Sequence, residues 1–123
     1  IQKAKKLRIF AKWWLSKYSL YSSTKTKIEH IRHDLLSLWG VGPETADSIL
    51  LYAFNKPVFV IDAYTKRLCK EYEIEFKTYD EYRNFFESQL PRNAKLFNEY
   101  HALIVAWGKL YSKDKEFALK IIK

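Results

Sequence analysis

The stretch LLSLWGVGPETADSILLYAFNKPVFVIDAYTKR, residues 35–67, decides the fold of this 123-residue chain, because it places a glycine-rich turn between two helical patterns. Before the turn, apolar residues recur at helical spacing, which predicts a helix that ends near Trp39. Gly40 and Gly42 can adopt positive φ angles at little cost. The two glycines therefore predict a sharp reversal of the chain.

A second helix is expected directly after this turn. Pro43 suits the first helical position, because its fixed φ is helical and its missing N–H would have no partner there. The apolar stripe that follows is narrow and contains small residues: Ala46, Ile49, Leu50 and Ala53. Small residues let two helices pack closely. The pattern predicts a helix–hairpin–helix within an all-α helical bundle.

The turn of a helix–hairpin–helix points backbone N–H groups outward beside a helix N-terminus. Such a site binds a phosphate oxygen without reading base sequence. The alternative is an ordinary glycine-rich turn in a helical bundle. The surrounding pattern favours the DNA-binding turn. The residues that fit its positions are Leu38, Gly40, Val41, Gly42, Thr45, Ala46 and Ile49.

The rest of the chain also predicts helices and no repeat. They are expected over residues 4–18, 63–72, 79–90 and 93–111, with the longest loop over 19–27. Val58–Ile61 is an apolar run without a partner strand, so we expect a buried extended connector. The inward residues of the last helix are expected to be Leu96, Tyr100, Leu103, Ile104 and Trp107. Residues 1–123 are expected to form a single domain without a membrane span or signal peptide.

The charge of the chain favours a polyanionic partner. Lysine and arginine number 22 against 14 aspartate and glutamate residues, which gives a net charge of +8. A basic surface releases counterions when it binds nucleic acid, and so gains affinity without sequence preference. The surplus is concentrated at residues 2–8 and 109–123. The second region is expected either to follow a phosphate backbone or to fray as a solvated terminus.

Two segments resemble a known family. LWGVGPETADSILLYA at 38–53 and PVFVIDAYTKRL at 57–68 are similar to the helix–hairpin–helix DNA glycosylase superfamily of the endonuclease III type. The run Glu44–Asp47 resembles the branch of 3-methyladenine DNA glycosylase III, and a weaker likeness continues over 79–111. The resemblance implies a DNA glycosylase of base excision repair that removes a damaged base, with an alkylated purine the expected substrate.

Asp62 is the catalytic aspartate that this resemblance implies. Breaking an N-glycosidic bond builds positive charge on the sugar, and a nearby carboxylate stabilises that charge. A carboxylate can also orient or deprotonate the attacking water. The alternative is that Asp62 only caps the helix that begins at Ala63. The two roles are compatible, because a cap fixes the position of the carboxylate.

The family's lyase members carry a lysine at the position of Glu44 in this chain. That lysine attacks the sugar and forms a Schiff base, which a carboxylate cannot do. The resemblance therefore implies a monofunctional enzyme that removes the base through water. Lys66 is expected to contact a DNA phosphate instead. The remaining DNA contacts are expected at Trp39, Gly40, Val41, Gly42 and Thr45.

No iron–sulfur cluster is expected, although many relatives hold one with four cysteines. Cys69 is the chain's one cysteine, and its pattern indicates a buried structural thiol. The resemblance implies at most a monovalent cation, held by the backbone carbonyls of Leu36, Leu38 and Val41. The three histidines are expected to be surface or packing residues: His30, His33 and His101.

The resemblance begins where family members already have several helices behind them. The chain is therefore expected to be the C-terminal portion of such a domain. The expected partner is double-stranded DNA with a damaged base, bound by a monomer in the cytoplasm and not at a membrane. Two alternatives remain open. One is a non-catalytic helix–hairpin–helix module or inactive fragment in which Asp62 is only a cap, and the other is an all-α protein-interaction domain.

Overall fold

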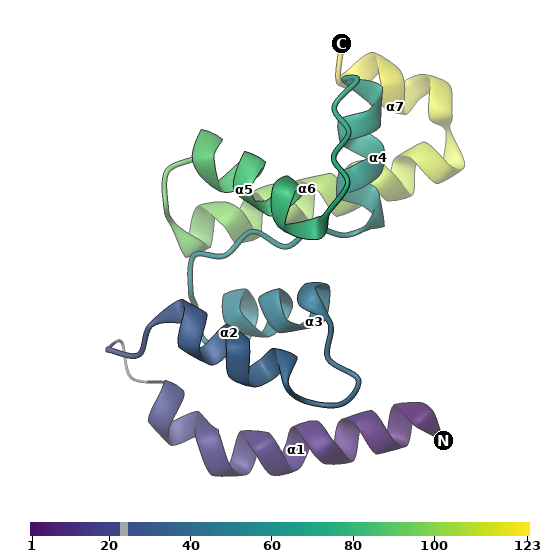
Figure 1. Ribbon diagram of the computed structural model, residues 1–123. Helices are drawn as coiled ribbons and strands as arrows, with labels where there is room; N and C mark the ends of the chain where they lie inside the picture. The colour runs from purple at the N-terminus through teal and green to yellow at the C-terminus, as the bar shows by residue number, and fades with distance from the viewer. Residues whose placement is uncertain (23–24) are drawn as a thin grey trace. The chain divides into compact units, whose positions relative to one another are not determined.

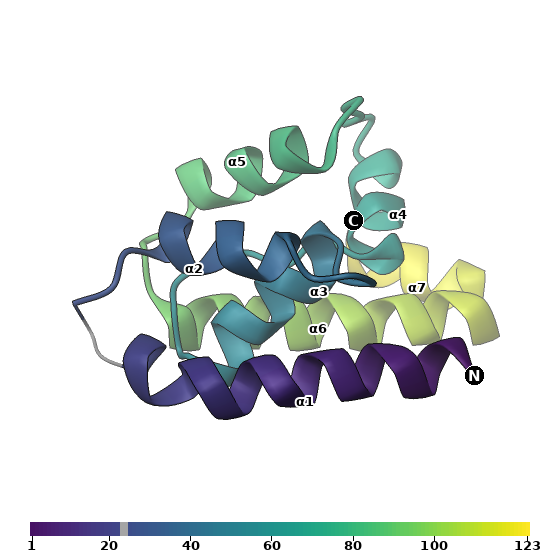
Figure 2. The same ribbon diagram turned by 60° about the horizontal axis from the view of Figure 1, so that its bottom comes forward.

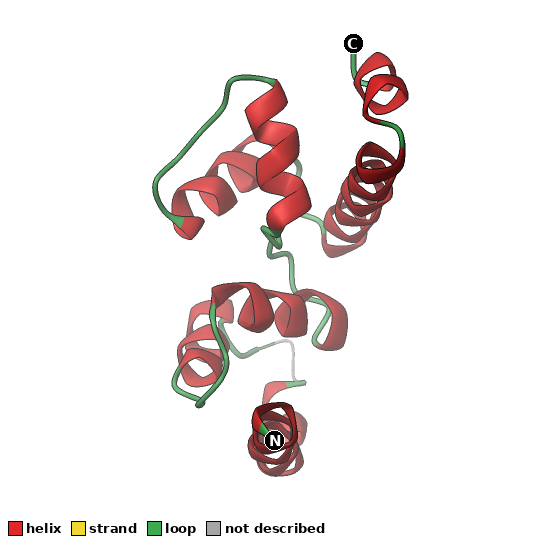
Figure 3. Ribbon diagram, turned by 90° about the vertical axis from the view of Figure 1, so that its right-hand side faces the viewer, coloured by secondary structure: helices red, strands yellow, loops and turns green. Residues whose placement is uncertain are grey.

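The computed structural model describes residues 1–22 and 25–123, and these residues form helices and loops without a strand (Figures 1 and 3). This confirms the all-α prediction. The chain divides into two compact units, Ile1–Lys56 and Pro57–Lys123. The first unit contains α1 (Gln2–Tyr21), α2 (Ile28–Leu36), α3 (Pro43–Ser48) and the π-helix η1 (Ile49–Ala53). The second contains α4 (Ala63–Glu71), α5 (Tyr79–Gln89), α6 (Ala94–Lys113) and α7 (Lys115–Ile121).

The membership of these units in one domain over 1–123 stays a prediction. Residues 23 and 24, which belong to the loop expected over 19–27, lie outside the described residues. Within the described ranges, no helix is both long enough and apolar enough to cross a membrane.

Asp34 of α2 ties α1 into the first unit. Its carboxylate accepts hydrogen bonds from Trp13 Nε1 at 3.2 Å and from the Tyr21 hydroxyl at 2.8 Å. Trp13 is buried, with its ring against Tyr21 and Phe54. Because Tyr21 has this partner, α1 extends past the expected end at Tyr18.

A buried ion pair joins the two helices of the hairpin. Arg32 of α2 donates from Nε to Asp47 Oδ1 at 2.7 Å and from Nη2 to Asp47 Oδ2 at 3.2 Å. The Asp47 side chain is fully buried, and that of Arg32 is 12% exposed. The bidentate geometry holds α3 in one orientation on α2.

The hairpin helices differ in two respects from the prediction. α2 ends at Leu36 and not near Trp39, because a hydrogen-bonded turn begins there: Ser37 N–H donates to the carbonyls of His33 and Asp34. The second helix changes at Ile49 from α to π geometry and ends with Phe54 N–H bonded to Ile49 O. The periodicity of apolar residues predicts a helix here but does not distinguish π geometry from α geometry.

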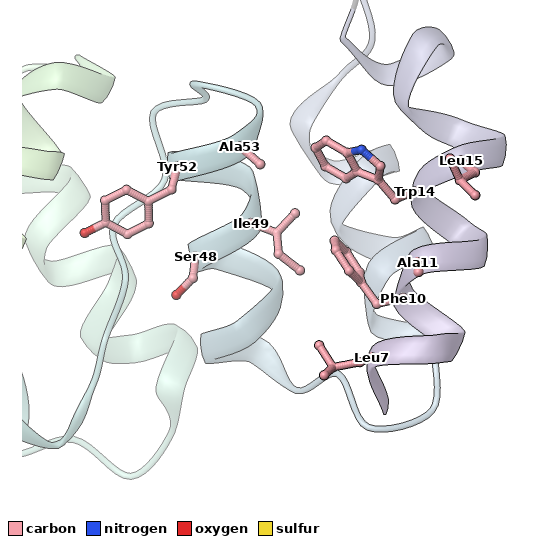
Figure 4. A pocket seen from close by; sticks show the side chains of 9 residues that line it. All are labelled: Leu7, Phe10, Ala11, Trp14, Leu15, Ser48, Ile49, Tyr52 and Ala53. Carbon is pink, nitrogen blue, oxygen red and sulfur yellow. The ribbon is translucent and has the colours of Figure 1, made fainter. Parts of the chain in front are cut away.

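The first unit has an open apolar groove between α1 and the second hairpin helix (Figure 4). Its cavity volume is about 740 Å³. Phe10 and Trp14 face Ile49 across it. Leu7 and Leu15 on its rim are largely exposed. One face of α1 therefore borders an open groove and not a closed core.

The second unit begins with the buried extended connector that the sequence predicts. Val58–Ile61 is fully or almost fully buried and belongs to no helix. Side chains supply the hydrogen-bond partners that a neighbouring strand would otherwise give: Phe59 N–H donates to Glu87 Oε2 at 2.9 Å, and Ile61 N–H to the Tyr79 hydroxyl at 3.2 Å. α5 thus fixes the connector that leads to Asp62.

α4 crosses α6 at Gly108, where a side chain would collide with the ring of Tyr64. The missing side chain is what allows the two helices to approach so closely. On α6, Ile104 and Trp107 are buried as expected, whereas Tyr100 and Leu103 are exposed, which corrects the predicted inward face. Phe97 is buried in their place.

The C-terminal lysine-rich segment continues α6 to Lys113 and then forms α7, so it is not a frayed end. Asp114 caps α7 by accepting from Phe117 N–H at 3.1 Å. Trp107 Nε1 donates to Ala118 O at 3.0 Å and holds α7 on α6. α7 turns back from the end of α6 (Figures 1 and 2). The sequence prediction missed this helix because its charged residues resemble a solvated tail.

Asp47→Asn should destabilise the folded protein by about 3 kcal/mol, because it breaks a bidentate ion pair whose Asp47 side chain is fully buried. Denaturant unfolding measures the effect. Asp80→Asn is the matched control, since Asp80 is 58% exposed and lies 3.7 Å from Arg83, and it should cost under about 1 kcal/mol. Equal losses for the two variants would contradict the role given to the Arg32–Asp47 pair.

Candidate functional site

The hairpin turn is a short hydrogen-bonded loop. Leu38 N–H donates to Leu35 O at 3.1 Å, and Val41 N–H to Leu38 O at 3.2 Å. Gly40 has a φ of +85° and so requires glycine; a Cβ there would also lie 2.6 Å from Lys6 Cγ. The prediction of positive φ is confirmed for this residue.

Gly42 does not adopt the positive φ that a glycine permits. Its φ is −98° and its ψ −177°, an extended conformation that any residue adopts. No atom lies within 4 Å of the position that a Cβ would take. The fold therefore does not demand glycine here, and the open space around Gly42 is available to a ligand.

α3 begins next to this open space. Gly42 is its N-cap and supplies no side-chain hydrogen bond, while Ala46 N–H is bonded to Gly42 O at 2.9 Å. Glu44 and Thr45 lie exposed in the first turn. Helix N-termini carry partial positive charge, so the turn offers an anion its backbone N–H groups.

Trp39 and Lys66, two of the expected DNA contacts, each take part in a contact between a lysine and an aromatic ring. Trp39 is 44% exposed at the hairpin, and Lys5 Nζ lies 4.2 Å from its ring centroid. This pairing places a cation beside the indole. Lys66 is exposed on α4, with Nζ 5.8 Å from the ring of Tyr82. Their contacts with DNA stay predictions.

The expected cation ligands are the carbonyls of Leu36, Leu38 and Val41. They belong to the end of α2 and to the turn, where carbonyls leave the regular helical pattern. The Leu38 carbonyl already accepts the Val41 N–H, so it would offer a cation its second lone pair. Carbonyl oxygens are suitable donors for a hard monovalent cation, and the site stays a prediction.

Asp62, in the second unit, is the N-cap of α4. This is one of the two compatible roles that the sequence predicts for it. Its Oδ1 accepts from Thr65 N–H and from the Thr65 hydroxyl, each at 2.9 Å. The connector ends at Asp62 and α4 begins at the next residue. The carboxylate is therefore held at a defined place, with 14% of its side chain exposed.

His101 of α6 is the functional neighbour that the sequence prediction missed. Its Nε2 lies 3.0 Å from Asp62 Oδ2, across 39 residues of sequence. The imidazole is 13% exposed, so the earlier expectation of a surface or packing role is incomplete. No periodic or spacing signal links the two residues, because the crossing of α4 and α6 brings them together.

These hydrogen bonds control the ionisation of Asp62. Burial favours the neutral acid, but the hydrogen bonds from His101 and Thr65 outweigh it and hold the pKa of Asp62 below its ordinary value. The carboxylate is thus an anion at neutral pH. Cys69 is buried, and burial raises the pKa of its thiol, which therefore stays protonated. This fits the structural role predicted for it.

The structure thus brings the predicted residues together in two groups. The hairpin of the first unit carries Trp39, Gly40, Val41, Gly42, Glu44 and Thr45. The second unit carries Asp62 with Thr65 and His101, and Lys66 in the same α4. Backbone N–H groups at a helix N-terminus and a largely shielded anionic carboxylate are the features of a helix–hairpin–helix protein with a candidate catalytic carboxylate.

Comparison with known proteins agrees with this class. The chain matches no protein-family model. It is 42% identical over 118 residues to a protein of Methanocaldococcus jannaschii that is named provisionally as a DNA repair glycosylase, over 92% of this chain and 54% of that protein. The crystal structure of the H. pylori 3-methyladenine DNA glycosylase MagIII bound to 1,N6-ethenoadenine has a TM-score of 0.68 and 32% identity, over 93% of this chain and 57% of that one.

These two similarities agree with the resemblance to DNA glycosylases that the sequence predicts, and one of the two proteins is a 3-methyladenine DNA glycosylase. The chain spans little more than half the length of both proteins.

Asp62 should make the stability of the protein depend on acidic pH. Because its folded pKa lies below the ordinary value of 3.8, its contribution is fully present above that value and is lost as the pH falls through the folded pKa. Between about pH 5 and pH 2, wild type should lose stability more steeply than Asp62→Asn. Denaturant unfolding at a series of pH values measures this, and parallel curves would contradict the lowered pKa.

Proposed function

We propose that the protein is a monofunctional DNA glycosylase of base excision repair, which hydrolyses the N-glycosidic bond of a damaged base. The observation that carries the proposal is Asp62, a largely shielded anion that is held by three hydrogen bonds and follows the helix–hairpin–helix in the sequence. Such an anion suits a reaction that builds positive charge on a sugar.

In the proposed reaction the bond between C1′ and the base nitrogen breaks, and the electron pair leaves with the base. The sugar becomes oxocarbenium-like, and the Asp62 carboxylate stabilises it through charge. Water adds to C1′ and loses a proton, which leaves an abasic site. The lowered pKa of Asp62 makes it a weak base, so electrostatic stabilisation is its main contribution and orientation of water its second.

The hairpin supplies the anchor on double-stranded DNA. A phosphate oxygen would accept from the N–H groups of the turn beside Gly42, with Thr45 and the Trp39 indole next to it. The net charge of +8 adds affinity without sequence preference. The protein would act as a DNA-associated monomer in the cytoplasm.

An alkylated purine is the proposed substrate class. The H. pylori relative is named for 3-methyladenine and binds 1,N6-ethenoadenine, an alkylated adenine. The rival function is a helix–hairpin–helix module that binds DNA without chemistry, with Asp62 only as the cap of α4. Excision of a damaged base separates the two functions.

Asp62→Asn in the full-length protein should lower excision of 1,N6-ethenoadenine from a duplex by on the order of 10²-fold or more, because the amide keeps the cap but loses the charge. Single-turnover release of the base is the measurement. Duplex affinity should be unchanged or slightly higher. Excision by the variant at the wild-type rate would rule out Asp62 as the catalytic group.

Gly42→Val should weaken binding to damaged and undamaged duplex alike while the melting temperature is kept, because the new side chain enters the space where the phosphate would bind. Gly40→Ala is the control for strain. It should lower stability through its positive φ. Wild-type DNA affinity for Gly42→Val, measured at moderate salt, would exclude this turn as the anchor.

The product of the reaction should be an uncut abasic site. Glu44 supplies no amine for a Schiff base, so borohydride should trap no protein–DNA adduct and alkali should be needed to nick the strand. Denaturing gels of a labelled duplex report both outcomes. Efficient trapping would mean that another amine acts as nucleophile, with Lys66 the first to replace by glutamine.

A further inference from the structure

We propose that His101 is a positioning residue for Asp62: by donating from Nε2 to Oδ2, it fixes the orientation of the carboxylate in the reaction. The proposal rests on the proposed glycosylase function and adds a residue to its site. It assigns His101 no contact with the substrate.

The two carboxylate oxygens of Asp62 accept hydrogen bonds from two different helices, α4 and α6. Oδ1 is held by Thr65 N–H and hydroxyl, both within the first turn of α4. These local bonds restrain one oxygen and leave the carboxylate free to pivot about it. His101 reaches Oδ2 from α6 at 3.0 Å. With both oxygens held, the plane of the carboxylate is fixed.

The support of His101 is rigid. α6 is in close contact with α4 at Gly108 and Tyr64, so the helix that carries the imidazole keeps a fixed distance from the helix that Asp62 caps. Both side chains are largely shielded from water, with exposures of 13% and 14%. Shielding strengthens a hydrogen bond to a charged group, because water competes less for either partner.

The donor also counteracts the cost of burying the anion. Burial by itself favours a neutral Asp62, which would not stabilise a positive sugar. The His101 hydrogen bond favours the ionised form, as do those of Thr65. An imidazole donates from Nε2 both in its neutral Nε2–H tautomer and when protonated. One side chain thus orients the carboxylate and keeps it charged.

Two substitutions separate donation from filling of space. His101→Phe keeps a ring but removes the donor, while His101→Gln keeps an N–H that reaches Oδ2. In the full-length protein, single-turnover excision of 1,N6-ethenoadenine should fall by roughly 10- to 100-fold in His101→Phe, the range expected for a hydrogen bond to a charged group. His101→Gln should stay within about threefold of wild type. Duplex affinity should be equal in all three.

A measurement without DNA tests the same contact independently of activity. The carbon signal of the Asp62 carboxyl, titrated by NMR, should report a higher pKa for Asp62 in His101→Phe than in wild type or His101→Gln. His33→Phe is the matched control, because His33 is exposed on α2, and it should change neither readout. If His101→Phe fails to fold, His101→Asn is used as the variant without a donor, because the asparagine side chain is too short to reach Asp62 Oδ2.

The outcomes separate this proposal from the proposed function. An unchanged Asp62 titration in His101→Phe, or excision by that variant at the wild-type rate, would overturn the positioning role. Equal loss in His101→Gln and His101→Phe would show that donation is not what matters, and would also overturn it. If Asp62→Asn excises like wild type, the glycosylase mechanism fails, whereas the NMR titration still decides whether His101 holds Asp62.

Discussion

The buried pair of Arg32 and Asp47 is the constraint on which the hairpin depends. Two charges are removed from water inside the first unit, which is tolerated because the contacts are bidentate and short. Apolar packing alone would let α3 slide or rotate on α2. The ion pair favours one orientation of α3 on α2, and the turn between the two helices contains Gly40 at positive φ and Gly42 beside open space. The proposed phosphate contacts use backbone atoms of the turn, and such contacts need a rigid base because no side chain can adjust.

In the second unit, hydrogen bonds between side chains and the backbone fix the position of the connector that leads to Asp62. A buried backbone segment outside any sheet must find partners for its N–H groups, and Glu87 and Tyr79 provide them. The connector can then end at Asp62 in one position. Thr65 and His101 complete the hydrogen bonding of the carboxylate. The candidate catalytic group is thus the end point of a chain of satisfied polar contacts, which explains how an anion remains charged in a largely shielded place.

Local patterns in the sequence were sufficient to predict the helices before α7, the hairpin, the buried connector and the cap at Asp62, because each depends on residues a few positions apart. The contacts between distant segments were not predictable in this way. His101 meets Asp62 only because α4 and α6 cross, and a histidine on a helix gives no sign of its partner. α7 was missed because its apolar face is short, and the extended Gly42 because glycine is compatible with either sign of φ. Arg32 and Asp47 are ordinary charged residues until the hairpin folds.

The crossing at Gly108 has a consequence for how this protein can diverge over evolution. Any side chain at this position meets the ring of Tyr64, so the helix that Asp62 caps would be pushed away from the helix that carries His101. Selection on the geometry around Asp62 would then act on a residue that does not contact Asp62. A larger residue at position 108 therefore requires a smaller residue at position 64, so the two positions are expected to change together.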